Sequence, residues 1–273
     1  MEGSQIMNTK KIMVGIPAYN ESETIGKTVE QIRKCIPEGT TAHIVVINDG
    51  STDDTTQKAL KSGADVIIEH DRNYGVGMTY QTAISYAVKN NIDVICTIDA
   101  DLQYNPSQIP NLLKPIIVGE TDLVIGSRFL DTKNNKNIPI SNLVGNRLMA
   151  AFVSLLVGYR IHDVESGFRA FSVDASKNIR VMGIGSFAKD MILDFMHNDY
   201  SIKEVPVSVK YYNGRTSRAI GSFIKYGLRS VFVIALKMFS LHMNIGFCKG
   251  KKSKARILYN NPTIILSQFI QSK

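Results

Sequence analysis

Short apolar runs rich in Val and Ile alternate with amphipathic segments along the first half of the chain. The runs end at Gly, Asn, Asp or Pro and predict strands, which we place at residues 11–17, 43–48, 64–69, 92–99 and 121–127. The segments between them have apolar residues at helical spacing and predict helices over residues 21–35, 54–61, 76–89 and 106–117. Strands that alternate with helices predict an α/β fold, with a Rossmann-like, mostly parallel sheet and helices on both faces.

The second half of the chain continues this domain. Its pattern predicts helices over residues 141–157 and 186–197 and a strand over residues 201–212, with a polar and aromatic segment at residues 163–171. No linker rich in Pro, Gly or Ser interrupts the chain before about residue 218, so we expect one domain up to that point. Residues 219–273 predict a further helix and then a basic tail.

Composition and charge narrow the choice of partners. The 273 residues are 44% hydrophobic and 21% charged, which is typical of a globular protein. The net charge of +8 favours anionic partners such as phosphorylated ligands or an acidic membrane surface. No nucleic-acid-binding motif accompanies this charge, so we expect no nucleic acid partner.

The sequence shows no pattern typical of secreted proteins or of Cys and His metal sites. The N-terminus is polar, unlike a signal peptide, and no apolar stretch reaches the roughly 20 residues that a membrane span needs. The three cysteines include no Cys-x-x-Cys pair, and the five histidines show no metal-ligand spacing. We therefore expect a cytoplasmic protein with reduced thiols, whose histidines are ordinary core or surface residues.

Polar side chains follow the first two predicted strands, at the edge where parallel sheets bind ligands. Residues 17–21 place a Tyr ring beside amide and carboxylate groups, which suits a heterocyclic base, although this segment alone favours a turn with a helix cap. Residues 48–54 predict a Gly turn with a cap equally well as a binding site. In a binding site, Asp49 would accept a hydrogen bond from a base N–H or a ribose hydroxyl.

The fourth predicted strand ends in the most specific signal. Asp99 and Asp101 follow an apolar run and, at alternate positions, point to the same side. Neighbouring carboxylates repel each other unless a cation lies between them. Mg²⁺ or Mn²⁺, bound through carboxylates and substrate phosphate oxygens, would remove that repulsion. We interpret the pair as a metal site.

Six motifs occur in a fixed order along the chain: PAYNE at residues 17–21, NDGS at 48–51, RNYGVG at 72–77, DADLQ at 99–103, GSR at 126–128 and SGFRAF at 166–171. In this order they resemble family 2 glycosyltransferases, and most of all the dolichyl-phosphate mannosyltransferase branch. The resemblance spans residues 11 to 218. Six ordered motifs are far more specific than any one of them.

This resemblance implies a glycosyltransferase A fold and metal-dependent transfer of a hexose, with inversion, from a nucleotide sugar such as GDP-mannose or a UDP-sugar. It implies a catalytic domain over residues 1–218, with a nucleotide-sugar half (11–128) and an acceptor half (129–218). The residues it assigns to the nucleotide sugar are Pro17, Tyr19, Glu21, Asp49, Asp99, Ala100 and Gln103. Those it assigns to the metal are Asp99, Asp101 and Gln103. Those it assigns to the acceptor side are Arg128, Arg147, Ser166 and Arg169, and the catalytic residues would be Asp101, Arg128 and Arg147. Arg215 is a further acceptor-binding candidate, because arginine orients phosphate.

The chain departs from the family pattern at two positions. Asn48 stands where the family usually has Asp, and Val76 where it often has a basic residue. The first departure alters a contact near the base, and the second removes a phosphate contact. A catalytically silent nucleotide-sugar-binding protein is therefore an alternative, against which the intact Asp99 and Asp101 pair argues.

The acceptor can be a lipid phosphate or a sugar hydroxyl. A hydroxyl must lose its proton to a base, for which Asp190 is the candidate, whereas a phosphate is already anionic and needs only orientation. Arginine orients phosphate with two parallel hydrogen bonds, and the acceptor half is rich in arginine. Dolichyl or another polyprenyl phosphate is therefore the expected acceptor, with a saccharide hydroxyl as the alternative.

The C-terminal segment predicts contact with a membrane surface. Lys225, Arg229 and Lys237 lie within about one third of a helical wheel, while apolar residues occupy most of the rest. The tail would attract anionic lipid through its basic residues Lys249, Lys251, Lys252, Lys254 and Arg256. Such a helix can lie in a membrane interface with its basic side chains extended to water. We expect peripheral binding to the cytoplasmic face of a membrane; a helix packed on the catalytic domain is the alternative.

Overall fold

The computed structural model describes residues 10–36, 41–130, 138, 140–177, 179, 187–211, 223–242, 254–259 and 269–271. Within them nine strands form one sheet in the order β7-β5-β6-β4-β1-β2-β3-β8-β9. The strands are β1 (Ile12–Ala18), β2 (Ala42–Asn48), β3 (Val66–His70), β4 (Val94–Thr97), β5 (Leu123–Ser127), β6 (Arg169–Ser172), β7 (Ile202–Pro206), β8 (Lys254–Tyr259) and β9 (Phe269–Gln271). The five strands predicted in the first half are confirmed, apart from small shifts at their ends.

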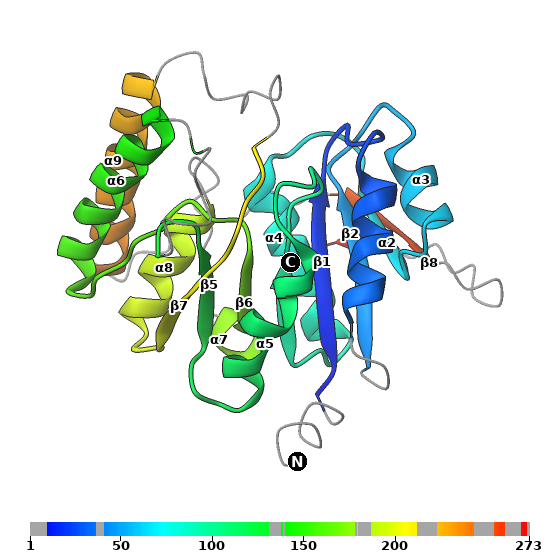
Figure 1. The fold of residues 1–273 in the computed structure, drawn as a ribbon, viewed down its shortest axis with the longest axis horizontal. Coiled ribbons are helices and arrows are strands. Elements are labelled where there is room, and N and C mark those ends of the chain that lie inside the picture. The colour runs from blue at the N-terminus through cyan, green and yellow to red at the C-terminus, as the bar shows by residue number, and fades with distance from the viewer. Residues whose placement is uncertain are drawn as a thin grey trace.

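Helices cover both faces of the sheet, as predicted (Figure 1). They are α2 (Ile25–Cys35), α3 (Thr55–Lys61), α4 (Val76–Lys89), α5 (Ile109–Ile117), α6 (Ile140–Val157), α7 (Val173–Ser176), α8 (Phe187–His197) and α9 (Phe223–His242), with a 3₁₀ turn η1 (Pro106–Gln108) before α5. One hydrophobic core joins α2, α3 and α5 to one face, and a second joins α4, α6, α8 and α9 to the other. Successive residues of β1 enter opposite cores, as Met13 and Val14 do, because side chains alternate along a strand.

The centre of the sheet is parallel, and one strand inside it is reversed. β1 pairs in parallel with β2 and β4, β2 with β3, and β5 with β7. β6 runs antiparallel between β4 and β5, with Arg169 opposite Thr97. Because β6 begins where β4 ends, this reversal brings the segment before Arg169 to the carboxyl end of β4.

The last described strands correct the prediction of a basic tail. Lys254 and Arg256 lie on β8, which pairs antiparallel with β3, and β9 pairs with β8. Ala255 is buried there. Part of the expected tail therefore extends the sheet, while Lys249, Lys251 and Lys252 lie outside the described residues.

Helix α9 is present, but one of its lysines is placed differently from the prediction. Lys237 is 1% exposed, and its Nζ lies 2.9 Å from Oδ2 of Asp194 on α8. Phe232 and Phe239, in contrast, are 63% and 53% exposed. Lys237 therefore turns inward and holds α9 to the domain, instead of extending to water beside a membrane.

Among the described helices, none has both the length and the apolar composition needed to cross a membrane.

Candidate active site

A cavity of about 330 Å³ lies at the carboxyl ends of β1, β2 and β4, where the sequence predicted ligand binding. We call it the central cavity. Its lining brings together six of the seven residues that the resemblance assigns to the nucleotide sugar and both aspartates of the metal site. The lining residues are Pro17, Ala18, Tyr19, Glu21, Asp49, Asn73, Gly75, Val76, Thr79, Asp99, Ala100 and Asp101.

Hydrogen bonds join the loops after β1 and β2 into one wall of the central cavity. The amide of Asn20 donates to Oγ of Ser51 at 2.9 Å, and the amide of Glu21 donates to Oγ1 of Thr55 at 2.9 Å. Asn20 has a φ of 53°, which is uncommon for a residue with a side chain. The loop after β1 is therefore held by the segment that follows the neighbouring strand β2, and it is not a simple helix cap.

Asn48 closes the turn after β2 and does not line the central cavity. Its Oδ1 accepts the amide of Ser51 at 2.9 Å, and its Nδ2 donates to Oγ1 of Thr56 at 2.7 Å. Thr56 in turn donates to Glu69 at 2.5 Å. Because the side chain of Asn48 is neutral, it adds no second negative charge beside Glu69. The turn is therefore intact, although the family usually has Asp at this position.

The carboxyl end of β4 carries the two aspartates on a tightly turned loop. The amide of Gln103 donates to Oδ1 of Asp101 at 3.0 Å, and Leu102 has a φ of 63°. Burial, and then the charges of Asp101 and Glu21, raise the pKa of Asp99 to about 7, although Arg128 acts in the opposite direction. Without a cation, therefore, the pair is electrostatically unfavourable when both members are ionised.

Asp99 and Asp101 fit a hard divalent cation as two of its ligands. Carboxylate oxygens are preferred by Mg²⁺ and Mn²⁺, and a cation would remove the repulsion that raises the pKa of Asp99. The described residues contain no group of three or more His, Cys, Asp or Glu side chains arranged for metal binding. Substrate phosphate oxygens and water would have to complete the coordination, so we expect the cation and a nucleotide to bind cooperatively.

We expect a divalent cation to stabilise the protein more at pH 8 than at pH 5.5. The pKa of Asp99, about 7, lies above its unfolded value of about 3.9, so this group lowers the free energy of unfolding as the pH rises from about 4 to 7. A bound cation requires the ionised carboxylate and competes with protons. Thermal unfolding with and without Mn²⁺ and UDP at both pH values measures the effect. Equal shifts, or a shift that persists in Asp99→Asn, would contradict it.

Gly167 provides the space that the Asp99 carboxylate occupies. A Cβ on Gly167 would lie 2.7 Å from Oδ1 and 2.8 Å from Oδ2 of Asp99. The carbonyl of Gly167 accepts Oγ1 of Thr97 at 2.8 Å and the hydroxyl of Tyr80 at 3.1 Å, so its backbone is fixed. The carboxylate would have to move to admit a methyl group.

Gly167→Ala should therefore weaken cation binding by about tenfold or more while the protein still folds, since overpacking costs about 1–3 kcal/mol. Titration with Mn²⁺ in the presence of UDP measures the affinity. Gly145→Ala is the matched control, because a Cβ there meets no atom within 4 Å. Unchanged affinity in Gly167→Ala would show that Asp99 is free to move.

Asp49 lines the central cavity, but its carboxylate also binds protein groups. Oδ1 accepts Nδ1 of His70 at 2.7 Å and the amide of Tyr74 at 2.9 Å, and Oδ2 accepts the amide of Gly75 at 2.7 Å. Burial alone would raise the pKa of Asp49, but these hydrogen bonds lower it below its ordinary value. Sequence reasoning missed His70, since a single His without a spacing pattern gives no signal.

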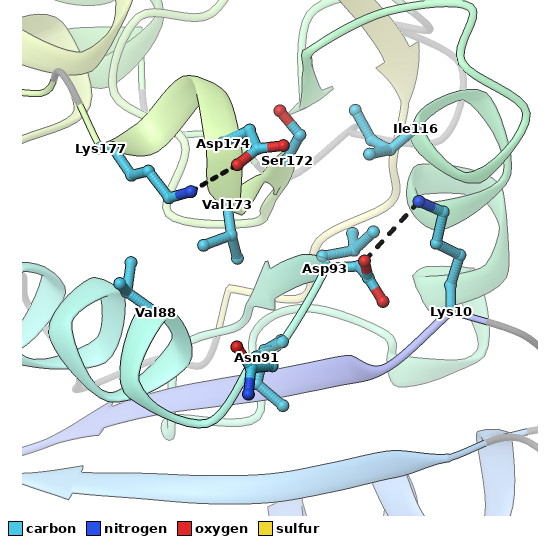
Figure 2. Close-up of a pocket in the computed structure, with 11 residues that line it drawn as sticks. Lys10, Val88, Asn91, Asp93, Ile116, Ser172, Val173, Asp174 and Lys177 are labelled. Carbon is cyan, nitrogen blue, oxygen red and sulfur yellow. Dashed lines mark hydrogen bonds and ion pairs between the residues drawn. The ribbon is translucent and has the colours of Figure 1, made fainter.

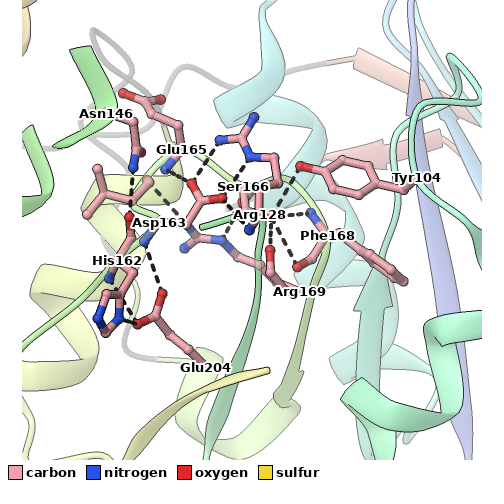
Figure 3. A network of polar contacts seen from close by, with 12 residues as sticks. Tyr104, Arg128, Asn146, His162, Asp163, Glu165, Ser166, Phe168, Arg169 and Glu204 are labelled. Carbon is pink, nitrogen blue, oxygen red and sulfur yellow. Dashed lines mark hydrogen bonds and ion pairs between the residues drawn. The ribbon is translucent and has the colours of Figure 1, made fainter. Parts of the chain in front are cut away.

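A buried network surrounds Arg128 and Asp163, on the expected acceptor side (Figure 3), and the charge of Arg128 acts on Asp99. Nε and Nη2 of Arg128 donate to Asp163 at 2.7 and 2.8 Å, and Asp163 is fully buried. Glu204 on β7 accepts the amides of His162 and Asp163 at 2.9 and 3.0 Å. The network fixes the Arg128 guanidinium, which retains 16% exposure. Asp163 and Glu204 belong to none of the six motifs and were not predicted.

Ser166 and Arg169 support this network from inside the protein. Arg169 is fully buried and donates to the carbonyls of Ser166, Val164 and Ala188. Oγ of Ser166, also buried, donates to the carbonyl of Gly126 at 2.6 Å. The structure therefore places both side chains in the protein interior, where they hold the segment before β6; their assignment to the acceptor stays a prediction.

Four other candidates lie away from the central cavity or outside the described residues. Gln103 lines a different cavity, beside Lys27 and Lys34 of α2, because the chain turns at Leu102. Arg147 is exposed on α6. Arg215 lies outside the described residues. Asp190, the candidate base for a hydroxyl acceptor, is 1% exposed within α8 and is not among the residues that line the central cavity.

A cavity of about 270 Å³ lies at the opposite edge of the sheet, near the starts of β1 and β4 (Figure 2). Its charged residues pair with each other: Lys10 lies 3.7 Å from Asp93, and Lys177 lies 2.6 Å from Asp174. These neutralised charges give no reason to expect a ligand there.

Comparison with known proteins agrees with this geometry. Residues 13–180 match the family model described as glycosyl transferase family 2. The UDP-N-acetylglucosamine–dolichyl-phosphate N-acetylglucosaminyltransferase of Methanococcus voltae is 30% identical over 253 residues, 85% of this chain and 98% of that protein. The polyprenol monophosphomannose synthase of Mycolicibacterium smegmatis is 28% identical over 82% of this chain and 86% of its own length.

A solved structure confirms the predicted fold. Glucosyl-3-phosphoglycerate synthase from Mycobacterium tuberculosis, crystallised with Mn²⁺ and UDP-glucose, superposes with a TM-score of 0.67 at 21% identity and covers 99% of this chain and 89% of its own. The architecture is thus the glycosyltransferase A fold. From the matched model and the relatives, the chain belongs to glycosyl transferase family 2 and is a glycosyltransferase.

Proposed function

We propose that this protein transfers a hexose from a nucleotide sugar to a polyprenyl phosphate, with a divalent cation and with inversion at the sugar carbon. The observation that carries the proposal is the Asp99 and Asp101 pair, which lines the central cavity beside the fixed guanidinium of Arg128. The M. voltae relative, named for a dolichyl-phosphate acceptor, supports the lipid acceptor. Residues 1–218 would form the catalytic domain.

Each wall of the central cavity would hold one part of the donor. Pro17, Tyr19 and Asp49 would hold the nucleoside, and Asp99 and Asp101 would hold Mg²⁺ or Mn²⁺ at the diphosphate. The cation would neutralise the negative charge that collects on the diphosphate as it departs. Direct attack on the sugar carbon from the side opposite the leaving group inverts that carbon and requires no nucleophile from the protein.

The acceptor side favours a phosphate over a hydroxyl. A phosphate monoester carries most of its second charge at pH 7 and needs no base, in keeping with the buried position of Asp190. Arg128 is held in one orientation by Asp163, and a fixed guanidinium can orient an anionic oxygen. Arg128 would therefore guide the phosphate toward the sugar carbon.

Exposed apolar residues on α6 and α9 suggest how the protein reaches a lipid. The two helices lie side by side beyond β5 and β7 (Figure 1). Leu148 and Leu155 on α6 are 70% and 81% exposed, and Phe232 and Phe239 on α9 are also mostly exposed. Arg147 is exposed next to Leu148 and would meet anionic headgroups. We infer peripheral contact of this surface with a membrane.

Transfer into lipid tests the reaction. Purified protein with Mn²⁺ or Mg²⁺ is incubated with dolichyl phosphate and, in turn, labelled GDP-mannose, UDP-glucose or UDP-N-acetylglucosamine, and label in the organic phase is counted. Metal-dependent label from one donor would support the proposal and identify the sugar. Donor hydrolysis without extractable label would favour a saccharide acceptor, and binding alone would favour a silent protein.

Flotation with anionic liposomes tests the membrane surface. The double variant Leu148→Asp with Phe232→Asp should lose most of its binding to vesicles, because it places two charges in the apolar surface. Val118→Asp is the matched control, since Val118 is 47% exposed after α5 and away from α6 and α9. Equal flotation of both variants would exclude this surface as the contact.

A further inference from the structure

His70 closes a chain of hydrogen bonds that runs from α4 to the central cavity. Its side chain is fully buried at the end of β3. Nδ1 lies 2.7 Å from Oδ1 of Asp49, and Nε2 lies 2.9 Å from Oγ1 of Thr82 on α4. With both ring nitrogens engaged, the imidazole has one orientation, and it links β2, β3 and α4 at the edge where the donor would bind.

The same chain fixes the loop at the rim of the cavity. Asp49 accepts the amides of Tyr74 and Gly75, and the Tyr74 ring meets the His70 ring edge-on, with centroids 5.5 Å apart. The loop crosses directly over Gly50, where a Cβ would lie 2.3 Å from the carbonyl carbon of Arg72. The rim therefore has little freedom while the Asp49 carboxylate stays in place.

The hydrogen bonds of Asp49 leave room for one further partner. An ionised carboxylate has about four acceptor positions. Oδ1 accepts from His70 and Tyr74, whereas Oδ2 accepts, among the residues that the structure describes, only the amide of Gly75. Asp49 lines the central cavity, so a ligand bound there could use the remaining acceptor position. It requires a donor such as a base N–H or a ribose hydroxyl.

We propose that His70 is a positioning residue for the nucleoside of the donor. Its imidazole holds Asp49 so that Oδ2 faces the central cavity and the loop of residues 72–75 closes the rim. This inference rests on the proposed nucleotide-sugar site. The affinity for the donor would then depend on His70, whose side chain does not line the central cavity.

The test compares two replacements of His70. Phe retains bulk and removes both ring nitrogens, whereas Asn keeps an N–H close to the place of Nδ1. Calorimetric titration with UDP and with GDP, each with Mn²⁺, measures the affinity. Binding should be weakened about tenfold in His70→Phe, because one hydrogen bond to a charged group is lost. In His70→Asn it should be weakened by less than about threefold. In transfer assays the donor KM should rise with kcat nearly unchanged, because the contact acts equally on substrate and transition state.

Ile92→Val is the control for lost stability, since Ile92 is buried at the opposite edge of the sheet; it should bind like wild type. Wild-type affinity in His70→Phe would overturn the inference and leave the proposed function standing. Equal weakening of His70→Phe and His70→Asn would also overturn it, because only packing would then matter. A wild-type protein that binds neither nucleotide would overturn the proposed donor site and this inference together.

Discussion

Replacing Asp101 by Asn should lower metal-dependent transfer by at least about a hundredfold, the order of loss seen when one group that stabilises developing charge is removed. The neutral amide binds a hard cation far less well than a carboxylate does. Asn can still accept the amide of Gln103, as Oδ1 of Asp101 does at 3.0 Å, so the turn at Leu102 should survive. The loss would then report on charge at the cation and not on the loop. Initial rates over a range of Mn²⁺ concentrations measure it.

Asp93→Asn is the matched control for this replacement. Asp93 is a partly exposed carboxylate at the opposite edge of the sheet, where it pairs with Lys10 (Figure 2). The control should keep the wild-type rate, because Asp93 does not line the central cavity. Full activity of Asp101→Asn at low Mn²⁺ would contradict the assignment of Asp101 to the cation.

The sheet could be predicted because its signals are local. Each parallel strand is a short apolar run with a polar end, and each helix has an apolar face, so the pattern identifies elements without knowledge of their partners. The reversal of β6 could not be predicted in the same way. Direction within a sheet depends on pairing with β4 and β5, which no local pattern encodes.

The residues that line the central cavity were easier to predict than the buried network around Arg128, for a related reason. Asp49, Asp99 and Asp101 follow directly from strands whose carboxyl ends meet at one edge, so chain position is enough to bring them together. The acceptor side depends on burial. Arg128 and Arg169 are the same residue type in adjacent motifs, yet Arg128 retains 16% side-chain exposure and Arg169 has none. This difference in burial depends on tertiary packing, such as the contact of Arg169 with the carbonyl of Ala188 on α8, which the motifs do not encode.

The orientation of the C-terminal helix α9 could not be predicted from the sequence either. A helical wheel places Lys225, Arg229 and Lys237 on one side of α9 but cannot say which side packs on the protein. Lys237 forms a buried ion pair with Asp194, so the apolar side chains Phe232 and Phe239 face outward. The wheel alone could not show that Phe232 and Phe239 would be exposed and not packed on the domain.

Replacing Arg128 by Ala should destabilise the protein by about 3 kcal/mol and abolish transfer. The Asp163 carboxylate is fully buried and loses its bidentate partner, and removing one member of a buried pair costs about 3–5 kcal/mol because the other charge is left uncompensated. The amides of Arg128 and Glu165 still donate to Asp163, which places the expected cost at the lower end. Urea unfolding followed by circular dichroism measures it, since the chain has no Trp.

The exposed pair of Arg33 and Asp65 provides the control. Its N to O distance is also 2.7 Å, but its side chains are 42% and 34% exposed, so Arg33→Ala should cost at most about 1 kcal/mol.

Burial would raise the pKa of Asp163, but Arg128 and the hydrogen bonds to the carboxylate lower it. The pair therefore contributes stability above the unfolded pKa of about 3.9 and loses it as the pH falls through the lowered folded pKa. The difference between wild type and Arg128→Ala should shrink on acidification; a difference independent of pH would mean that lost packing, not the buried charge, causes the destabilisation.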